Sequence, residues 1–178
     1  RRFLTEIGSR TFRKPFALRS FREKIDDLFQ AVDFLSQKRI GALIAMSRVA
    51  NASGADMLTA IDIAYEICSR LAATLLAGPP WTLDQGYGTA LGATGGICHL
   101  LGLSREQTTH AISFAAANGV PLRVSRAGEL SHYKGVATAV SSRHAVFCVH
   151  MARSGMTAPS APFEGRHGIV ELVRGKEG

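Results

Sequence analysis

The sequence is poor in aromatic residues and contains no long apolar run. Phe, Trp and Tyr make up 7% of its 178 residues, and alanine supplies much of the 46% hydrophobic fraction. A β-sandwich needs β-branched and aromatic residues on its strands, so this composition favours closely packed helices. No apolar stretch reaches the length of a membrane span, and we therefore expect no membrane partner. The chain is long enough for one domain with a substantial core.

Cysteine is also scarce, and its spacing argues against metal and disulfide sites. Cys68, Cys98 and Cys148 stand far apart, and the sequence has no CxxC pair. An odd number of thiols does not suit a closed disulfide framework. Three thiolates hold an iron–sulfur cluster in some dehydratases, but the short spacing typical of such clusters is missing. We expect reduced core cysteines, no metal and no other cofactor.

The net charge of +7 is concentrated near the N-terminus. Residues 1–40 hold ten Lys and Arg against five Asp and Glu, and so contribute +5 of the total. The rest of the chain is nearly balanced and has no basic stripe interleaved with aromatic residues, which argues against nucleic-acid binding. Positive charge also suits an anionic small-molecule substrate.

Residues 1–22 are rich in Arg and Phe and contain a single acidic residue. This is one signature of an organellar transit segment, and an ordinary basic surface segment explains it equally well. No apolar region follows that would mark a secretory signal. The predicted location is the cytoplasm, with the mitochondrial matrix as the alternative.

Apolar residues recur at helical spacing along most of the chain, without useful strand alternation, so the predicted fold class is all-α. Helices are predicted over 23–35, 40–50, 53–77, 88–101, 104–117 and 134–153, with one more short turn at 158–161. For the third helix the inward residues are Met57, Ile61, Ala64, Cys68, Leu71 and Leu75. For the 134–153 helix they are Val136, Val140, Phe147 and Met151.

Capping residues mark several helix ends. Ser53 and the Ser104–Gln107 capping box predict helix starts, and Gly102 and Gly155 predict helix ends. The glycine-rich run GYGTALGATGG has neither a GxxxxGK[ST] pattern nor a strand before it. It is therefore better explained by tight helix packing than by phosphate binding.

Three sequence blocks together resemble one protein family. The segment that begins VPLRVSRAGELSHYKG at residue 120, the helix ASGADMLTAIDIAYEICSRL, and the element LLGLSREQTTHAISFAAAN occur in the order seen in the MmgE/PrpD family. The resemblance covers residues 40–170. The LRxxRAGELSxxKG block is similar to the 2-methylcitrate dehydratase branch.

The resemblance implies an all-α helical bundle that, in full-length members, packs against a smaller α/β domain. We expect that α/β domain to be absent here, because the sequence ends at Gly178. The predicted domains are a basic segment, 1–38, that does not match the family, and a helical domain, 39–178. Family members are usually homodimers, and the resemblance therefore implies a homodimer that binds a small-molecule tricarboxylate.

Site residues follow from the same motifs. Lys134 falls on the family's active-site lysine, and the start of a helix beside Arg123 and Arg126 could bind a substrate carboxylate. His132 is a candidate acid or base, or a polar residue at the rim. Gln85 stands where the family places a catalytic histidine, and an amide cannot exchange a proton near neutral pH.

The departures from the family pattern leave two kinds of function open. The upstream Asp26-Asp27 is not followed by Thr, and the position expected for another histidine falls near Leu35. The first hypothesis is a 2-methylcitrate dehydratase-like lyase of propionate metabolism, either whole or an incomplete copy, with a cis-aconitate decarboxylase-like or epimerase activity as a variant. The second is a catalytically impaired relative that acts as a binding or assembly module.

Overall fold

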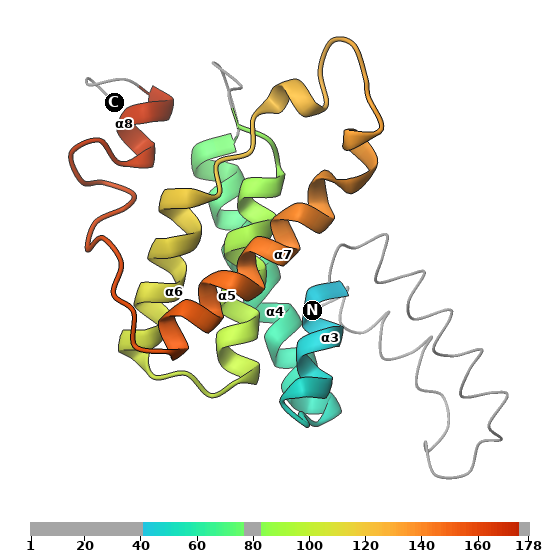
Figure 1. The fold of residues 1–178 in the computed structure, drawn as a ribbon, viewed down its shortest axis with the longest axis vertical. Coiled ribbons are helices and arrows are strands. Elements are labelled where there is room, and N and C mark those ends of the chain that lie inside the picture. Colours follow the sequence, from blue (N-terminus) through green and yellow to red (C-terminus); the bar gives the residue numbers. More distant parts are fainter. Residues whose placement is uncertain (1–40, 77–82, 175–178) are drawn as a thin grey trace, which may run out of the picture. The chain divides into compact units, whose positions relative to one another are not determined.

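A computed structural model describes residues 41–76 and 83–174, where all regular elements are helical (Figure 1). They are α3 (Gly41–Val49), α4 (Gly54–Leu71), a π-helical turn η2 (Ala72–Leu76), α5 (Gly86–Leu100), α6 (Arg105–Asn118), a 3-10 turn η3 (Arg123–Ser125), α7 (Tyr133–Arg153) and α8 (Ile169–Arg174). These ranges contain no strand, only an isolated bridge between Leu83 and Leu122. The predicted all-α class is confirmed, and the helix predicted at 23–35 lies outside the described residues.

Two capping boxes fix the starts of α4 and α6, as predicted. The Ser53 hydroxyl accepts the Asp56 N–H at 3.1 Å, and the Asp56 carboxylate accepts the Ser53 N–H at 3.0 Å. Ser104 and Gln107 exchange the same pair of hydrogen bonds at 3.1 Å. Each box satisfies two N–H groups that the helix itself leaves without partners. At the opposite ends, Gly102 and Gly155 adopt positive φ angles of 61° and 89°, as helix-terminating glycines commonly do.

Helix α5 is almost wholly buried and packs against α4, α6 and α7. Its glycines allow this close packing. A Cβ on Gly92 would lie 2.4 Å from the carbonyl oxygen of Ala64, and one on Gly96 would lie 2.6 Å from that of Ala60. The predicted role of the glycine-rich run in tight helix packing is confirmed.

The inward face of α7 differs from the prediction. Val136 and Phe147 are 51% and 56% exposed, and Val140 and Met151 are only half-buried. The buried residues are instead Ala137, Ser141, Ala145, Cys148, Val149 and Ala152. Small side chains face α5 because two helices can approach closely only where neither carries bulk at the contact. Periodicity correctly predicted a helix here. The choice of the largest apolar residues as its buried face was wrong.

The segment after α7 also departs from the prediction. Residues 158–161 are not helical and lie along α6, where the Ser113 hydroxyl donates to the Pro159 carbonyl and the Ala158 N–H donates to His110 Nδ1 at 3.2 Å. Helix α8, which has only six residues, was not predicted. Its Ile169 and Val173 join a buried cluster that includes Tyr87 and Leu91.

The three cysteines are thiols rather than disulfides, and Cys98 and Cys148 are buried, while Cys68 is half-buried. Over the described part of the chain, no helix is both long and apolar enough to cross a membrane.

Candidate functional site

A buried carboxylate organises the start of α5. Asp84 is 1% exposed, and its Oδ1 accepts the Gly86 N–H at 2.7 Å. Its own N–H donates to the Pro121 carbonyl at 2.9 Å, beside the bridge between Leu83 and Leu122. Because the carboxylate satisfies a helix-terminal N–H, α5 begins two residues earlier than the predicted start at residue 88. The next side chain, Gln85, is exposed and caps nothing.

Arg126 supplies the countercharge for Asp84. Arg126 Nε lies 2.5 Å from Asp84 Oδ2, and Nη2 donates to the hydroxyl of Thr138 at 3.1 Å. The two charged side chains are 18% and 1% exposed. A carboxylate this deeply buried needs such a partner, since removal from water strongly disfavours an isolated charge. Arg126 therefore joins the segment before α5 to the second turn of α7.

The contacts of α7 show which of its faces carries Lys134. Thr138 contacts Arg126, and a Cβ on Gly86 would lie 2.6 Å from the Ser141 hydroxyl oxygen. Lys134, Thr138 and Ser141 follow one another at helical spacing and so share a face. On this face, Thr138 and Ser141 are directed at Arg126 and at the start of α5, and Lys134 lies one turn before Thr138. There Lys134 is exposed, as is Gln85.

The first turn of α7 offers fewer N–H groups than the sequence suggested. The Tyr133 N–H donates to the Ser131 hydroxyl at 3.3 Å, the Lys134 N–H to the Ser131 carbonyl at 3.2 Å, and the Gly135 N–H to the His132 carbonyl at 3.0 Å. The expectation that free helix-terminal N–H groups bind a carboxylate here is therefore wrong. Residues 131 and 132 form a tight turn that satisfies them, which leaves the charge of the Lys134 side chain.

The two remaining predicted residues lie on the connection between α6 and α7, which extends away from the helices in Figure 1. Arg123 opens η3 and is exposed, and its carbonyl accepts the Arg126 N–H at 2.8 Å. His132 is exposed and immediately precedes α7. The structure thus brings Gln85, Arg126 and the Lys134 face of α7 to one region, and places Arg123 and His132 on the adjoining connection.

Sequence reasoning missed Asp84, Thr138 and Ser141 as parts of this region. The local sequence contained a usable signal for Asp84, because an Asp side chain at a helix start commonly accepts the N–H two residues later, as Asp84 does from Gly86. Its partner Arg126 is 42 residues away. No local spacing rule links such a pair, so only the packing of α5 against α7 reveals it.

The thiols do not contribute chemistry to this region. Burial raises the pKa of Cys98 and of Cys148 to about 11 each. The thiolate is the reactive and metal-binding form of cysteine, so both are inert protonated thiols near neutral pH. In the part of the chain that the structure describes, His, Cys, Asp and Glu nowhere gather in the groups of three or more that could hold a metal ion.

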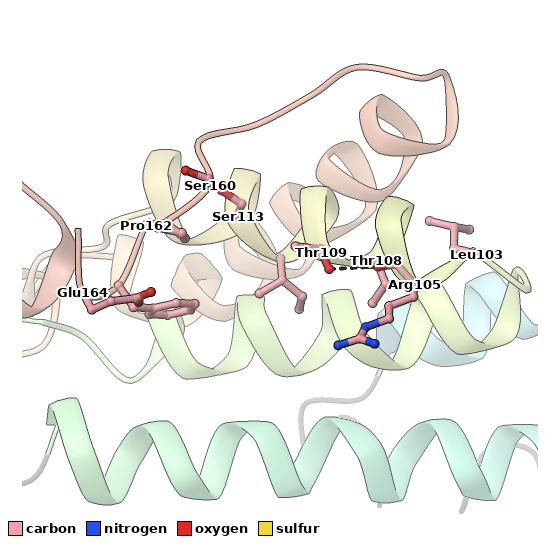
Figure 2. Close-up of a pocket in the computed structure, with 10 residues that line it drawn as sticks. Leu103, Arg105, Thr108, Thr109, Ser113, Ser160, Pro162 and Glu164 are labelled. Atoms are coloured by element: carbon pink, nitrogen blue, oxygen red, sulfur yellow. Dashed lines mark hydrogen bonds between the residues drawn. The ribbon is translucent and has the colours of Figure 1, made fainter. Parts of the chain in front are cut away.

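Two adjoining hollows lie elsewhere, both bordered by α6. One of about 420 Å³ is bordered by α6 and residues 160–164, and Figure 2 shows Arg105 and Glu164 toward its opposite ends. The other, of about 410 Å³, shares Leu103, Thr108 and Ile112 with it. Two hydroxyls of the first hollow are bonded within the protein, since Thr109 donates to the Arg105 carbonyl at 2.9 Å and Ser113 donates to the Pro159 carbonyl. Neither hollow is lined by Lys134, His132 or Gln85.

These features define a class, that of helical domains built around a buried, glycine-rich central helix with a basic region at its start. The model of the MmgE/PrpD N-terminal domain matches residues 24–178, and the chain belongs to this family. The match begins upstream of the boundary near residue 38 that the sequence suggested, and the division at that residue stays a prediction.

Proposed function

We propose that the chain is the helical part of a 2-methylcitrate dehydratase-like lyase, which eliminates water from a citrate-like tricarboxylate in propionate metabolism. The observation that supports the proposal is the face of α7 that Lys134 shares with Thr138 and Ser141, because Thr138 bonds Arg126 and Ser141 lies beside Gly86, which follows Gln85 in the chain. Lys134 stands within the RAGELSHYKG block on which the resemblance to the dehydratase branch depends.

The reaction requires three groups. A base removes a proton from the carbon next to a carboxylate, a double bond forms, and the hydroxyl on the neighbouring carbon leaves as water after receiving a proton. Cationic side chains hold the carboxylates and stabilise the charge that develops. We assign Lys134 the roles of binding a substrate carboxylate and stabilising the charge that develops. Arg123 is a further substrate-binding residue. His132 is the proton-transfer candidate on the adjoining connection, and Gln85 is a hydrogen-bonding group.

A second candidate function rests on Gln85. This exposed amide cannot exchange protons as the family's histidine would. A relative impaired in catalysis would retain the helical scaffold and the binding residues, and act as a binding or assembly module. Decarboxylation of cis-aconitate or an epimerisation are the variants of the enzyme hypothesis. For all of them we propose a homodimer in the cytoplasm, with the mitochondrial matrix as the alternative.

The test incubates the purified chain with 2-methylcitrate and follows the absorbance of the unsaturated product. We expect turnover, and we expect Lys134→Ala to reduce it at least a hundredfold because the charge on the substrate side is lost. Arg153→Ala, an exposed cation in the last turn of the same helix, should leave turnover unchanged.

The same experiment separates the alternatives. If wild-type protein binds 2-methylcitrate in calorimetry without converting it, the binding-module function is supported. Conversion of cis-aconitate but not of 2-methylcitrate would favour the decarboxylase variant. Equal turnover by Lys134→Ala and wild type would exclude Lys134 from the site.

A further inference from the structure

We propose that Arg126 is a positioning residue, which acts through its bonds to Asp84 and Thr138 and fixes the second turn of α7, next to Lys134, relative to the segment before α5. The inference rests on the proposed function where it concerns catalysis. It assigns Arg126 a role different from the substrate binding that the sequence predicted.

The guanidinium of Arg126 already bonds two side chains of the protein. Nε is 2.5 Å from the carboxylate of Asp84, and Nη2 is 3.1 Å from the hydroxyl of Thr138. A substrate carboxylate would have to compete with Asp84 for the guanidinium. Asp84 is 1% exposed, so solvent could not replace Arg126 as the partner of its carboxylate. Because leaving one partner of a buried ion pair uncompensated is strongly unfavourable, Arg126 is held in place by the fold.

The bonds of Arg126 connect the two sides of the proposed site. Asp84 immediately precedes Gln85 in the chain, and Thr138 lies one helical turn after Lys134 on the same face. A single side chain thereby links the residue next to Gln85 with the turn next to Lys134. The distance between these two groups is set by the ion pair and by packing at Gly86, where the Ser141 hydroxyl leaves no room for a Cβ.

The connection between α6 and α7 depends on the same pair. Its backbone is tied to the segment before α5 by the Asp84 N–H bond to Pro121 and the bridge between Leu83 and Leu122. Beyond Arg126, residues 127–136 are all exposed. An exposed stretch with little buried apolar contact opens easily, so loss of the ion pair should loosen the connection as well as the first turn of α7.

The first experiment measures the local order of residues 120–136 and does not depend on catalytic activity. Hydrogen–deuterium exchange is recorded for peptides covering 120–136 in the wild type, Asp84→Asn, Arg126→Met and the double variant. We expect exchange to be at least tenfold faster in each single variant than in the wild type. Exchange in the double variant should not be faster than in the single variants, because both substitutions break the same interaction. Peptides of α4 should be unchanged.

A matched control is the exposed ion pair between Arg70 and Glu66 on α4, whose side chains are 78% and 60% exposed. Glu66→Gln removes a charge from an ion pair as Asp84→Asn does, and it should change exchange nowhere in 120–136. Thr138→Val and Arg126→Lys provide milder variants in case Asp84→Asn does not fold. Thr138→Val removes the hydroxyl that Nη2 bonds, and Arg126→Lys keeps the positive charge but lacks the planar fork that bonds both partners. Each should accelerate exchange by a smaller factor.

The second experiment measures KM and kcat for 2-methylcitrate. A positioning role predicts that Asp84→Asn and Arg126→Met lower kcat by similar factors, because both displace Lys134. Direct substrate binding predicts that Arg126→Met raises KM at least tenfold, while Asp84→Asn does not, and that exchange in 120–136 stays at the wild-type rate. That result would overturn the proposal. If wild-type protein shows no turnover, the proposed function fails, and the exchange experiment still decides whether Arg126 orders the segment.

Discussion

His144 is an imidazole held against the backbone at the end of α6. A Cβ on Gly119 would lie 2.3 Å from His144 Cδ2, and Cys148 Sγ lies 3.4 Å from His144 Nε2. Burial lowers the pKa of His144, and the neighbouring charge of Arg143 acts in the same direction, against a hydrogen bond to the Ala115 carbonyl. The folded protein therefore favours the neutral ring.

This environment makes stability depend on pH in a defined direction. The unfolded chain binds a proton at His144 near its ordinary pKa of about 6.5, whereas the folded chain binds it only at lower pH. The contribution to stability is therefore fully present above about pH 6.5 and decreases as the pH falls toward the lowered pKa. We expect the urea concentration at the unfolding midpoint to decrease as the pH is lowered from 7.5 to 5.5. We expect His144→Asn to make this decrease smaller. His150→Asn, an exposed histidine on the same helix, should leave the slope as in wild type, and an equal slope in all three proteins would contradict the assignment.

At the scale of elements, the contact between α4 and α5 is limited by backbone atoms. The atom nearest to a Cβ on Gly92 would be the Ala64 carbonyl oxygen, at 2.4 Å, and a backbone atom cannot rotate away as the end of a side chain can. The two helices must separate to accommodate any side chain at this position. Their close packing thus depends on glycine at this position.

We expect Gly92→Ala to lower the free energy of unfolding by about 1–3 kcal/mol, the usual cost of overpacking a core. Gly135→Ala is the matched control, since Gly135 lies within α7 and a Cβ there would have nothing within 4 Å. Alanine in an open helical position stabilises by about 0.5–1 kcal/mol relative to glycine. Urea unfolding of both variants measures the two effects, and a Gly92→Ala protein as stable as wild type would show that the helices can separate freely.

Elements also show where sequence prediction worked. The Ser53 and Ser104 caps and the terminating glycines act within a few residues, so they were readable from the sequence and were confirmed. The orientation of α7 was not readable, because its neighbour α5 selects small residues for contact. The large apolar residues Val136 and Phe147 therefore lie on the exposed side of α7.

At the scale of the whole molecule, the exposed apolar residues of α7 form one stripe. Tyr133, Val136 and Phe147 are 46%, 51% and 56% exposed and follow one another at helical spacing, with half-buried Val140 between them. This face differs from the one that carries Lys134. Contiguous exposed apolar surface commonly marks an association site, and the proposed homodimer would cover it with a second copy.

We expect the wild-type chain to elute as a dimer in size-exclusion chromatography with light scattering. Phe147→Asp should shift it toward the 19.0 kDa monomer, because a charge would be buried without a partner. Leu172→Asp, at a residue of α8 that is 67% exposed, should leave the dimer intact. A wild-type protein that elutes as a monomer would exclude this assembly.

The sequence by itself determined the helical class, most helix boundaries and the family, because hydrophobic periodicity, caps and motifs are local properties of the chain. Motif position also identified Lys134 and Arg126 as residues of interest. Only the tertiary structure decided what surrounds them. It paired Arg126 with Asp84 over 42 positions of sequence, turned the Lys134 face toward the start of α5, and used the first N–H groups of α7 internally. Each of these depends on which helices pack together and how closely, and the packing of α5 fixes both through its glycines.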